Sequence, residues 1–239
     1  LGKVTDTQDT TGTVLEEHPV EVTEEQVKEA VLSFTGEYMQ VPPMYSALKV
    51  NGKKLCDLAR AGVTVERQAR PVQLYSIEII KMELPRVCMR VRCSKGTYIR
   101  TLCQDIGEKL SCGACMESLL RTKVSEFCVQ DALRLSEIEE RVQKAAGQTQ
   151  SEQWNAEMFD FIYAVDSVFL QYKKAVICKE WNKLLYNGNR MKKDMFVSYQ
   201  KDWEQQKVRI YDEEGRFIGI YEYSEIHGDY KPVKLFMEA

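Results

Sequence analysis

The chain has 239 residues, of which 44% are hydrophobic and 29% are charged, and its formal net charge is −3. This is ordinary globular composition, and the length suits one large domain or one domain with a smaller companion. No apolar run is long enough to cross a membrane and no signal-peptide pattern opens the sequence, so we expect a soluble cytoplasmic protein that contacts no membrane.

Eight cysteines occur, mostly as single residues in apolar surroundings, as is typical of free buried thiols. The one close pair is Cys112 and Cys115, in CGAC. A zinc site would need two further ligands at comparable spacing, and His18 and His227 lie far from the pair in sequence. We interpret the pair as structural, with metal or redox chemistry as the less favoured alternative.

Charge is segregated along the chain. Residues 43–71 carry six cations against two carboxylates, and residues 86–123 carry eight cations against three. The acidic residues concentrate in residues 1–37 and 126–166. A globule with one basic face fits a polyanionic partner, although any single cation can equally be solvated surface charge.

The first predicted helix lies within residues 20–34. Thr23 is a suitable N-cap, Glu24 and Glu25 suit the first turn, and apolar residues at helical spacing form one stripe that Gly36 closes.

Residues 40–71 then form a basic, turn-rich excursion. It contains paired prolines, a possible tight turn at Asn51-Gly52 and a short helix-like KKLCDLARAG. We expect a loop that becomes ordered on binding.

Two strands are predicted next, at residues 72–82 and 87–93. In the second strand apolar residues alternate with Cys88, Arg90 and Arg92, so one face should pack on the core.

The stretch CSKGTYIRTL, residues 93–102, leads from that strand into a helix that closes at residues 111–113. Arg100 lies in its first turn, where the helix dipole disfavours a cation by roughly a few tenths of a kcal/mol unless an anion is close. We therefore expect an anion beside Arg100. Tyr98, just before it, is as compatible with a half-buried core residue as with a functional one.

Beyond this helix we expect a further helical turn before residues 118–122, a helix at 136–146 and a flexible loop at 147–153. A small β-rich module should follow, with a short helix near 179–186 and turns at 187–189 and 213–215. Its strands are expected in MFVSY, KVRIY, RFIGIYEY and VKLFME.

Two motifs, PPMYSALKVNGKKLCDLARAG and VRCSKGTYIRTLCQDIGEKLSCGACMESLLRT, together resemble the TruB family of tRNA pseudouridine synthases, which isomerise uridine 55 in the TΨC loop. The resemblance implies an α+β pseudouridine synthase fold with a mixed, largely antiparallel sheet in residues 1–166. Residues 43–71 would be an RNA-gripping thumb loop, and residues 167–239 a small PUA-like β-barrel that binds RNA.

The resemblance also implies a site. In this family an aspartate nucleophile detaches uracil from ribose after the nucleotide has been flipped into a pocket, and the base is rejoined through carbon. Arg100 is similar to the arginine that pairs with that aspartate, and Tyr98 to the tyrosine that contacts the base and is a candidate for removing its C5 proton. Leu119 matches an apolar wall of the base pocket, and Asp9 an acidic loop residue near the site.

The implied partner is the T-arm stem-loop of tRNA, bound by a monomer without cofactor, metal or protein partner. The residues expected to contact RNA are Tyr45, Lys49, Lys53, Lys54, Arg60, Arg67, Arg70, Lys95 and Arg121.

Two features depart from the family pattern. Leu120 occupies the place of a usual arginine, so one expected cation is absent. The Gly-x-x-Asp-Pro-x-Ala-Thr-Gly segment that carries the nucleophile, and a Lys-x-Tyr segment with a second stacking tyrosine, occur nowhere in the 239 residues. We therefore expect an N-terminally truncated enzyme without turnover, which aggregates if the absent part contributes strands. The alternatives are a non-catalytic tRNA-binding or tRNA-folding protein and, less favoured, an α+β domain with a coincidental motif.

Overall fold

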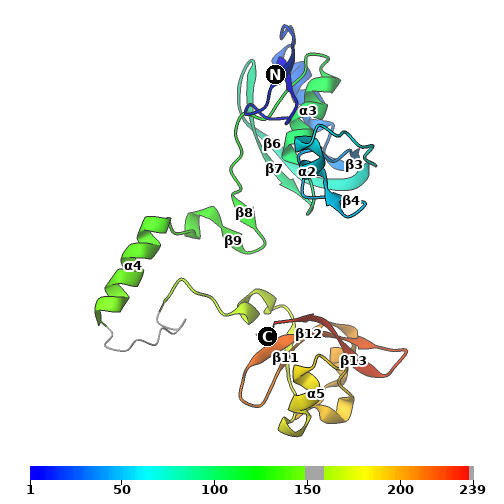
Figure 1. Cartoon of the computed structure of the whole chain (residues 1–239), viewed down its shortest axis with the longest axis vertical. Helices are drawn as coiled ribbons and strands as arrows, with labels where there is room; N and C mark the ends of the chain where they lie inside the picture. The colour runs from blue at the N-terminus through cyan, green and yellow to red at the C-terminus, as the bar shows by residue number, and fades with distance from the viewer. Residues whose placement is uncertain (149–158, 237–239) are drawn as a thin grey trace. The chain divides into compact units, whose positions relative to one another are not determined.

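The structure is a computed structural model that describes residues 1–148 and 159–236 (Figure 1). Contacts divide the chain into two compact units, Leu1–Leu120 and Arg121–Ala239. The border between functional domains expected after residue 166 stays a prediction. No helix in the described part of the chain is both long and apolar enough to span a membrane.

The first unit contains a three-stranded antiparallel sheet in the order β3-β6-β7. The two long strands are the predicted ones, and on β7 the apolar side chains alternate with exposed Cys88, Arg90 and Arg92 as expected. A separate pair, β1 with β2, is also antiparallel. The bounds are β1 Lys3–Thr5, β2 Val14–Glu17, β3 Gly36–Gln40, β6 Arg70–Glu83 and β7 Arg86–Cys93.

Two helices, α1 Glu24–Leu32 and α3 Ile99–Lys109, supply the core that covers this sheet. Thr23 caps α1 as predicted: its hydroxyl accepts a hydrogen bond from the Gln26 amide, while the Gln26 side chain accepts one from the Thr23 amide. Such a capping box stabilises a helix by about 1 kcal/mol. The buried core residues are Val27, Val31, Leu74, Ile77, Leu102 and Ile106.

The thumb segment, residues 43–71, contains a small hairpin and a short helix. β4 Lys49–Val50 pairs with β5 Lys53–Lys54 across the predicted Asn51-Gly52 turn, where both residues have positive φ, 50° and 80°. α2 Leu55–Arg60 follows and anchors the segment through Leu55, which is buried. The lysines of the hairpin remain exposed.

The helical turn predicted before residues 118–122 is wrong. α3 ends at a turn in which Ser111 and Gly113 have positive φ, and residues 117–122 form neither helix nor strand. Met116 instead pairs with the loop after β1: its amide donates to the Gln8 carbonyl at 2.9 Å, and its carbonyl accepts from the Thr10 amide at 3.0 Å. Backbone pairing with this distant segment overrides the local helix propensity.

The second unit begins with β8 Lys123–Val124 and β9 Phe127–Cys128, followed by α4 Leu135–Gln148, the helix predicted at 136–146. Residues 147 and 148 of the predicted loop belong to α4, and residues 149–153 lie outside the described residues. The 3-10 helices in the described part of this unit are Val129–Asp131, Val165–Phe169, Lys179–Trp181, Lys193–Met195 and Lys201–Gln205.

A four-stranded sheet, in the order β10-β11-β12-β13, forms the rest of this unit. Three of the expected strand sequences contribute β11 to β13, and the hairpin turn at 213–215 is confirmed by the antiparallel pairing of β11 with β12. MFVSY is not a strand: Phe196 makes only an isolated bridge with Ile177. The bounds are β10 Lys173–Val176, α5 Asn182–Tyr186, β11 Val208–Tyr211, β12 Phe217–Ser224 and β13 Asp229–Leu235.

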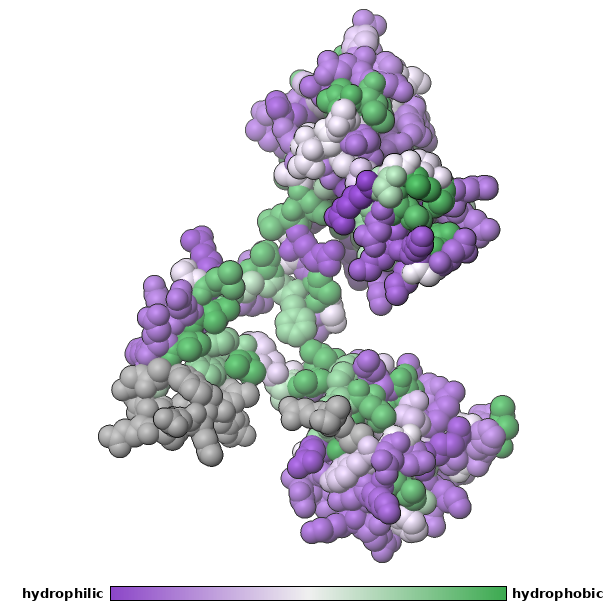
Figure 2. All heavy atoms as spheres, viewed as in Figure 1, coloured by the Kyte–Doolittle hydropathy of each residue, from purple (hydrophilic) through white to green (hydrophobic). Residues whose placement is uncertain are grey.

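The parallel pairing of β10 with β11 was not expected from the sequence. The sheet packs on a core rich in aromatic residues, including Phe196, Trp203, Tyr221 and Tyr230. Within residues 159–236 the four strands form an open sheet and no closed barrel. Figure 2 shows that hydrophilic residues cover much of the visible surface of each unit.

Candidate functional site

Arg100, the second residue of α3, donates three hydrogen bonds from its guanidinium. Its Nη1 donates to the Thr7 carbonyl and to Asp9 Oδ2, both at 3.1 Å, and its Nη2 donates to the Tyr45 carbonyl at 2.8 Å. The Arg100 and Asp9 side chains are only 24% and 17% exposed. The anion that the helix dipole predicted is therefore present, and it is Asp9. The family resemblance assigned a different partner to Arg100, the nucleophilic aspartate of a segment that the 239 residues do not contain, and that pairing stays a prediction.

Asp9 is itself held from several sides. Its Oδ1 accepts hydrogen bonds from Thr7 Oγ1 at 2.8 Å, the Thr11 amide at 3.0 Å and Thr11 Oγ1 at 2.5 Å. Burial opposes ionisation, but these bonds and the Arg100 guanidinium outweigh it and hold the pKa of Asp9 below its ordinary value. Asp9 is thus an ionised anchor that ties the loop after β1 to the start of α3.

Tyr98 lies directly before α3 in an extended conformation, with φ −98° and ψ 106°, and its side chain is partly exposed. Its backbone is bound by the side chain of Gln40, the last residue of β3. Gln40 Oε1 accepts from the Tyr98 amide at 2.8 Å, and Gln40 Nε2 donates to the Tyr98 carbonyl at 3.0 Å. Sequence reasoning missed Gln40, because no local pattern joins it to Tyr98, 58 residues further along the chain.

Leu119 is not part of this cluster. It is 57% exposed, and Leu120 is 71% exposed, in the non-helical segment that follows Met116. The role of Leu119 as a wall of the base pocket stays a prediction. Arg121 is exposed and opens the second unit.

The cations expected to contact RNA fall into two groups. Arg60 forms an exposed ion pair with Asp57 at 3.6 Å, and Arg67 donates to the Pro42 carbonyl at 3.1 Å, which braces the thumb segment. The others are exposed and form no ion pair with any residue that the structure describes; they are Lys49, Lys53, Lys54, Arg70, Lys95 and Arg121. Tyr45 is partly buried and contributes its carbonyl to Arg100.

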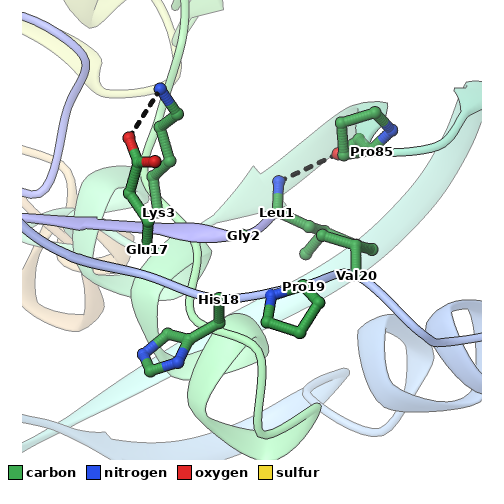
Figure 3. A pocket seen from close by; sticks show the side chains of 8 residues that line it. All are labelled: Leu1, Gly2, Lys3, Glu17, His18, Pro19, Val20 and Pro85. Carbon is green, nitrogen blue, oxygen red and sulfur yellow. Dashed lines mark hydrogen bonds and ion pairs between the residues drawn. The ribbon is translucent and has the colours of Figure 1, made fainter.

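A separate pocket of about 440 Å³ lies beside β1 and β2 (Figure 3). The Leu1 amino group donates to the Pro85 carbonyl at 2.9 Å, and Lys3 pairs with Glu17 at 3.1 Å. This pocket shares no lining residue with the Arg100 cluster. The lining residues are Leu1, Gly2, Lys3, Glu17, His18, Pro19, Val20 and Pro85.

The described residues bring together no group of three His, Cys, Asp or Glu side chains that could hold a metal ion. All eight cysteines are free; Cys112 is buried and Cys115 is partly buried, with burial raising the pKa of the Cys115 thiol. The structural interpretation of the CGAC pair stays a prediction.

Comparison with known proteins identifies the family. Residues 1–99 match the N-terminal domain of TruB family pseudouridylate synthases, and residues 100–170 match the tRNA pseudouridylate synthase B C-terminal domain. A tRNA pseudouridine synthase B of Lachnoclostridium phytofermentans is 47% identical over 218 residues, which cover 87% of this chain and 67% of that protein. A tRNA pseudouridine synthase B of Clostridium kluyveri is 38% identical over 237 residues, which cover 99% of this chain and 75% of that protein. The chain therefore belongs to the TruB family of pseudouridine synthases, and a coincidental motif is excluded.

Solved structures agree at the level of the fold. A chain in a Cbf5-Nop10-Gar1 complex superposes with a TM-score of 0.63 at 20% identity, over 92% of this chain and 63% of that one. A chain in an H/ACA RNP bound to a substrate RNA containing 2'-deoxyuridine superposes with a TM-score of 0.60 at 18% sequence identity. The match covers 92% of this chain and 64% of that chain. This chain thus spans less than two thirds of the length of those chains. It shares their mixed helix-and-sheet fold.

Proposed function

We propose that this chain forms part of a tRNA pseudouridine synthase that isomerises uridine 55 in the TΨC loop. The observation that carries the proposal is the start of α3, where Tyr98 and Arg100 occupy motif positions of the TruB family. Both are held in place by contacts from segments remote in sequence, Gln40 to Tyr98 and Asp9 to Arg100. A fixed Tyr98 backbone and a fixed Arg100 guanidinium are suited to a reaction that depends on exact placement of a flipped base.

In the proposed reaction the N–C bond between uracil and ribose breaks, the base turns, and a C–C bond forms from C5 to the ribose. N1 of the uracil gains a proton and C5 loses one, so the step is redox-neutral. The partly exposed Tyr98 phenol contacts the flipped base and is the candidate for taking the C5 proton. Arg100 supplies positive charge next to the site.

Asp9 does not serve as the nucleophile in this proposal. Three donors bind its Oδ1 and the Arg100 guanidinium binds its Oδ2, so its carboxylate is engaged in holding the loop after β1 to the start of α3. The family resemblance places the nucleophile in a Gly-x-x-Asp segment, and the 239 residues contain none. We therefore propose that these residues alone bind the T-arm but do not convert it.

The exposed thumb cations, Lys49, Lys53, Lys54 and Arg70, are proposed to grip the T-arm backbone, because no carboxylate in the described part of the chain neutralises them. The β-rich module is proposed to be PUA-like and to bind RNA as well. Lys183, which is exposed, and Lys207, which is partly exposed, support this role. Replacing both by glutamine should lower the affinity for whole tRNA.

The test uses the 239-residue chain and an unmodified T-arm stem-loop, with binding followed by a gel-shift titration and pseudouridine by chemical mapping. We expect binding that weakens with salt, and no pseudouridine. A stem-loop of the same length with a scrambled loop is the control. Conversion of uridine 55 at a rate typical of enzymes would contradict the proposal that the nucleophile lies outside these residues.

A second function, a non-catalytic tRNA-binding or tRNA-folding protein, is favoured by one observation: the one carboxylate that binds Arg100 among the described residues also accepts hydrogen bonds that order its own loop. The two proposals differ when the missing segment is supplied. Residues that precede the matching region in the Lachnoclostridium phytofermentans relative can be joined to Leu1. Pseudouridine formation by this chimera that is lost in Tyr98→Phe favours the enzyme, and tight binding without conversion favours the binder.

A further inference from the structure

We infer that Gln40 is a positioning residue, which fixes the backbone of Tyr98 and thereby the place of its phenol. This inference rests on the proposed function in one respect, that the phenol of Tyr98 contacts the target base. The geometry of the Gln40 contact itself is independent of that proposal.

The hydrogen bonds of the Gln40 side chain use all the hydrogens that its amide can donate. Oε1 accepts from the Tyr98 amide at 2.8 Å, and the two hydrogens of Nε2 go to the Tyr98 carbonyl, at 3.0 Å, and to the Tyr38 hydroxyl. Gln40 is 1% exposed, so water cannot replace these bonds. A buried amide with this set of partners is costly to remove, because the Tyr98 amide would lose its acceptor, while the Tyr98 carbonyl would retain the bond from the Leu102 amide at 3.0 Å.

Other contacts hold the neighbours of Tyr98, and the bond to its amide comes from Gln40. In the turn before it, at residues 94–97, the Ser94 amide donates to the Gln73 carbonyl at 2.8 Å, and after it the Leu102 amide donates to the Tyr98 carbonyl at 3.0 Å. Tyr98 is the N-cap of α3, yet its side chain makes no capping hydrogen bond. The Gln40 amide, 58 residues away in sequence, therefore supplies the long-range contact that fixes φ and ψ of Tyr98.

The same contact links the site to the thumb. Gln40 ends β3 directly before the segment that leads into the thumb, and five residues later the Tyr45 carbonyl binds Arg100. Residues 40–45 are thus hydrogen-bonded to the start of α3 at both proposed site residues. A change at Gln40 should affect Tyr98 directly and Arg100 only indirectly.

Two substitutions separate positioning from packing. Gln40→Met keeps the approximate shape and removes both bonds to Tyr98 at every pH. Gln40→Glu introduces a group that, as a carboxylate, can accept from the Tyr98 amide but repels the Tyr98 carbonyl. As a carboxylic acid it can accept and donate like the amide. Burial raises the pKa of such a carboxyl above its ordinary value of about 4.3, so the acid form is present at mildly acidic pH.

The measurement is the 19F NMR spectrum of the chain labelled with 3-fluorotyrosine, in which Tyr98→Phe identifies the resonance of Tyr98. In Gln40→Met this resonance should shift or broaden at all pH values. In Gln40→Glu it should do so at about pH 8 and return to the wild-type position at about pH 5. Tyr221 and Tyr230, buried in the second unit, are internal standards, and Tyr38→Phe, which spares both bonds to Tyr98, should leave the Tyr98 resonance in place.

A Tyr98 resonance that is unchanged in Gln40→Met, or equally displaced at both pH values in Gln40→Glu, would overturn the inference. If Gln40→Met unfolds the first unit, the pH contrast in Gln40→Glu decides alone.

Binding of the T-arm separates this inference from the proposed function. We expect about a tenfold rise in Kd for both Gln40→Met and Tyr98→Ala. If Tyr98→Ala binds as well as wild type while the resonance still shifts, the proposed role of Tyr98 fails and the positioning role of Gln40 stands.

Discussion

At the scale of residues, the pairing of Arg100 with Asp9 is the central contact of the site. An arginine in the first turn of a helix predicted an anion nearby, and that prediction is confirmed. Its identity could not be reached from local sequence, because Asp9 and Arg100 are 91 residues apart and meet only in the folded unit. For the same reason Gln40 was missed, since nothing in GEYMQ indicates a bond to Tyr98.

Replacing Asp9 by asparagine should destabilise the first unit. The variant keeps the shape but removes the charge that Arg100 faces in a partly buried setting, so we expect the free energy of unfolding to fall by about 2 kcal/mol at neutral pH. Urea denaturation measures it. Glu83→Gln, which breaks an exposed ion pair with Lys81, is the control and should cost less than about 0.5 kcal/mol.

The difference between Asp9→Asn and wild type should depend on pH. The pKa of Asp9 is lower in the folded state than its unfolded value of about 3.9, so its stabilisation is complete above that value. It is lost as the pH falls through the folded value. A stability difference that persists undiminished at about pH 2 would contradict this account of Asp9.

At the scale of elements, local signals predicted what local interactions form. The cap at Thr23 correctly predicted α1, and the alternation on β7 correctly predicted one of the two long strands. The sequence around Met116 predicted a helical turn, but backbone pairing of Met116 with residues 8–10 determines the structure of this segment. β10 was missed because a four-residue strand, KKAV, is recognisable only through its parallel pairing with β11.

On α3, Asp105 should weaken the fold at neutral pH. Burial, and then the nearby Glu108 carboxylate, raise the pKa of Asp105 to about 6. Because the folded value exceeds the unfolded value of about 3.9, stability should rise as the pH falls from about 6 to about 4. The Tyr38 phenol also lies close enough to interact with this carboxylate.

Replacing Asp105 by asparagine should therefore stabilise the chain by about 1 to 2 kcal/mol at about pH 7.5 and by almost nothing at about pH 4. Thermal unfolding at several pH values provides the measurement. A loss of stability at the higher pH would show that the ionised carboxylate makes a favourable contact.

The thumb hairpin should contribute to RNA binding through charge alone. Replacing both Lys53 and Lys54 with glutamine should weaken T-arm binding and lower the slope of log K against log salt by about 2, because about one counterion is released per phosphate contact. The matched control is Lys81→Gln, a lysine of β6 that pairs with Glu83. An unchanged slope in the double variant would remove the hairpin from the RNA interface.

At the scale of the whole molecule, the two units have separate hydrophobic cores. Leu102 belongs to the core of the first unit, and Ile210 to that of the second. The predicted tendency to aggregate stays a prediction; large apolar residues on the first unit support it, among them Met39 at 58% and Tyr75 at 54% exposure.

Core substitutions should therefore act on one unit each. We expect Leu102→Ala and Ile210→Ala each to cost about 3 kcal/mol, and each to lower the midpoint of a different calorimetric transition. A single transition that both variants shift equally would contradict this division.

The measurement that tests the central claim most directly is pseudouridine formation at uridine 55 by the 239-residue chain and by the chimera carrying the upstream segment of its Lachnoclostridium phytofermentans relative. We expect no product from the chain alone, product from the chimera, and none from the chimera with Tyr98→Phe or Arg100→Met. A chimera that binds the T-arm tightly but forms no pseudouridine, or one whose activity survives both substitutions, would contradict the proposed site.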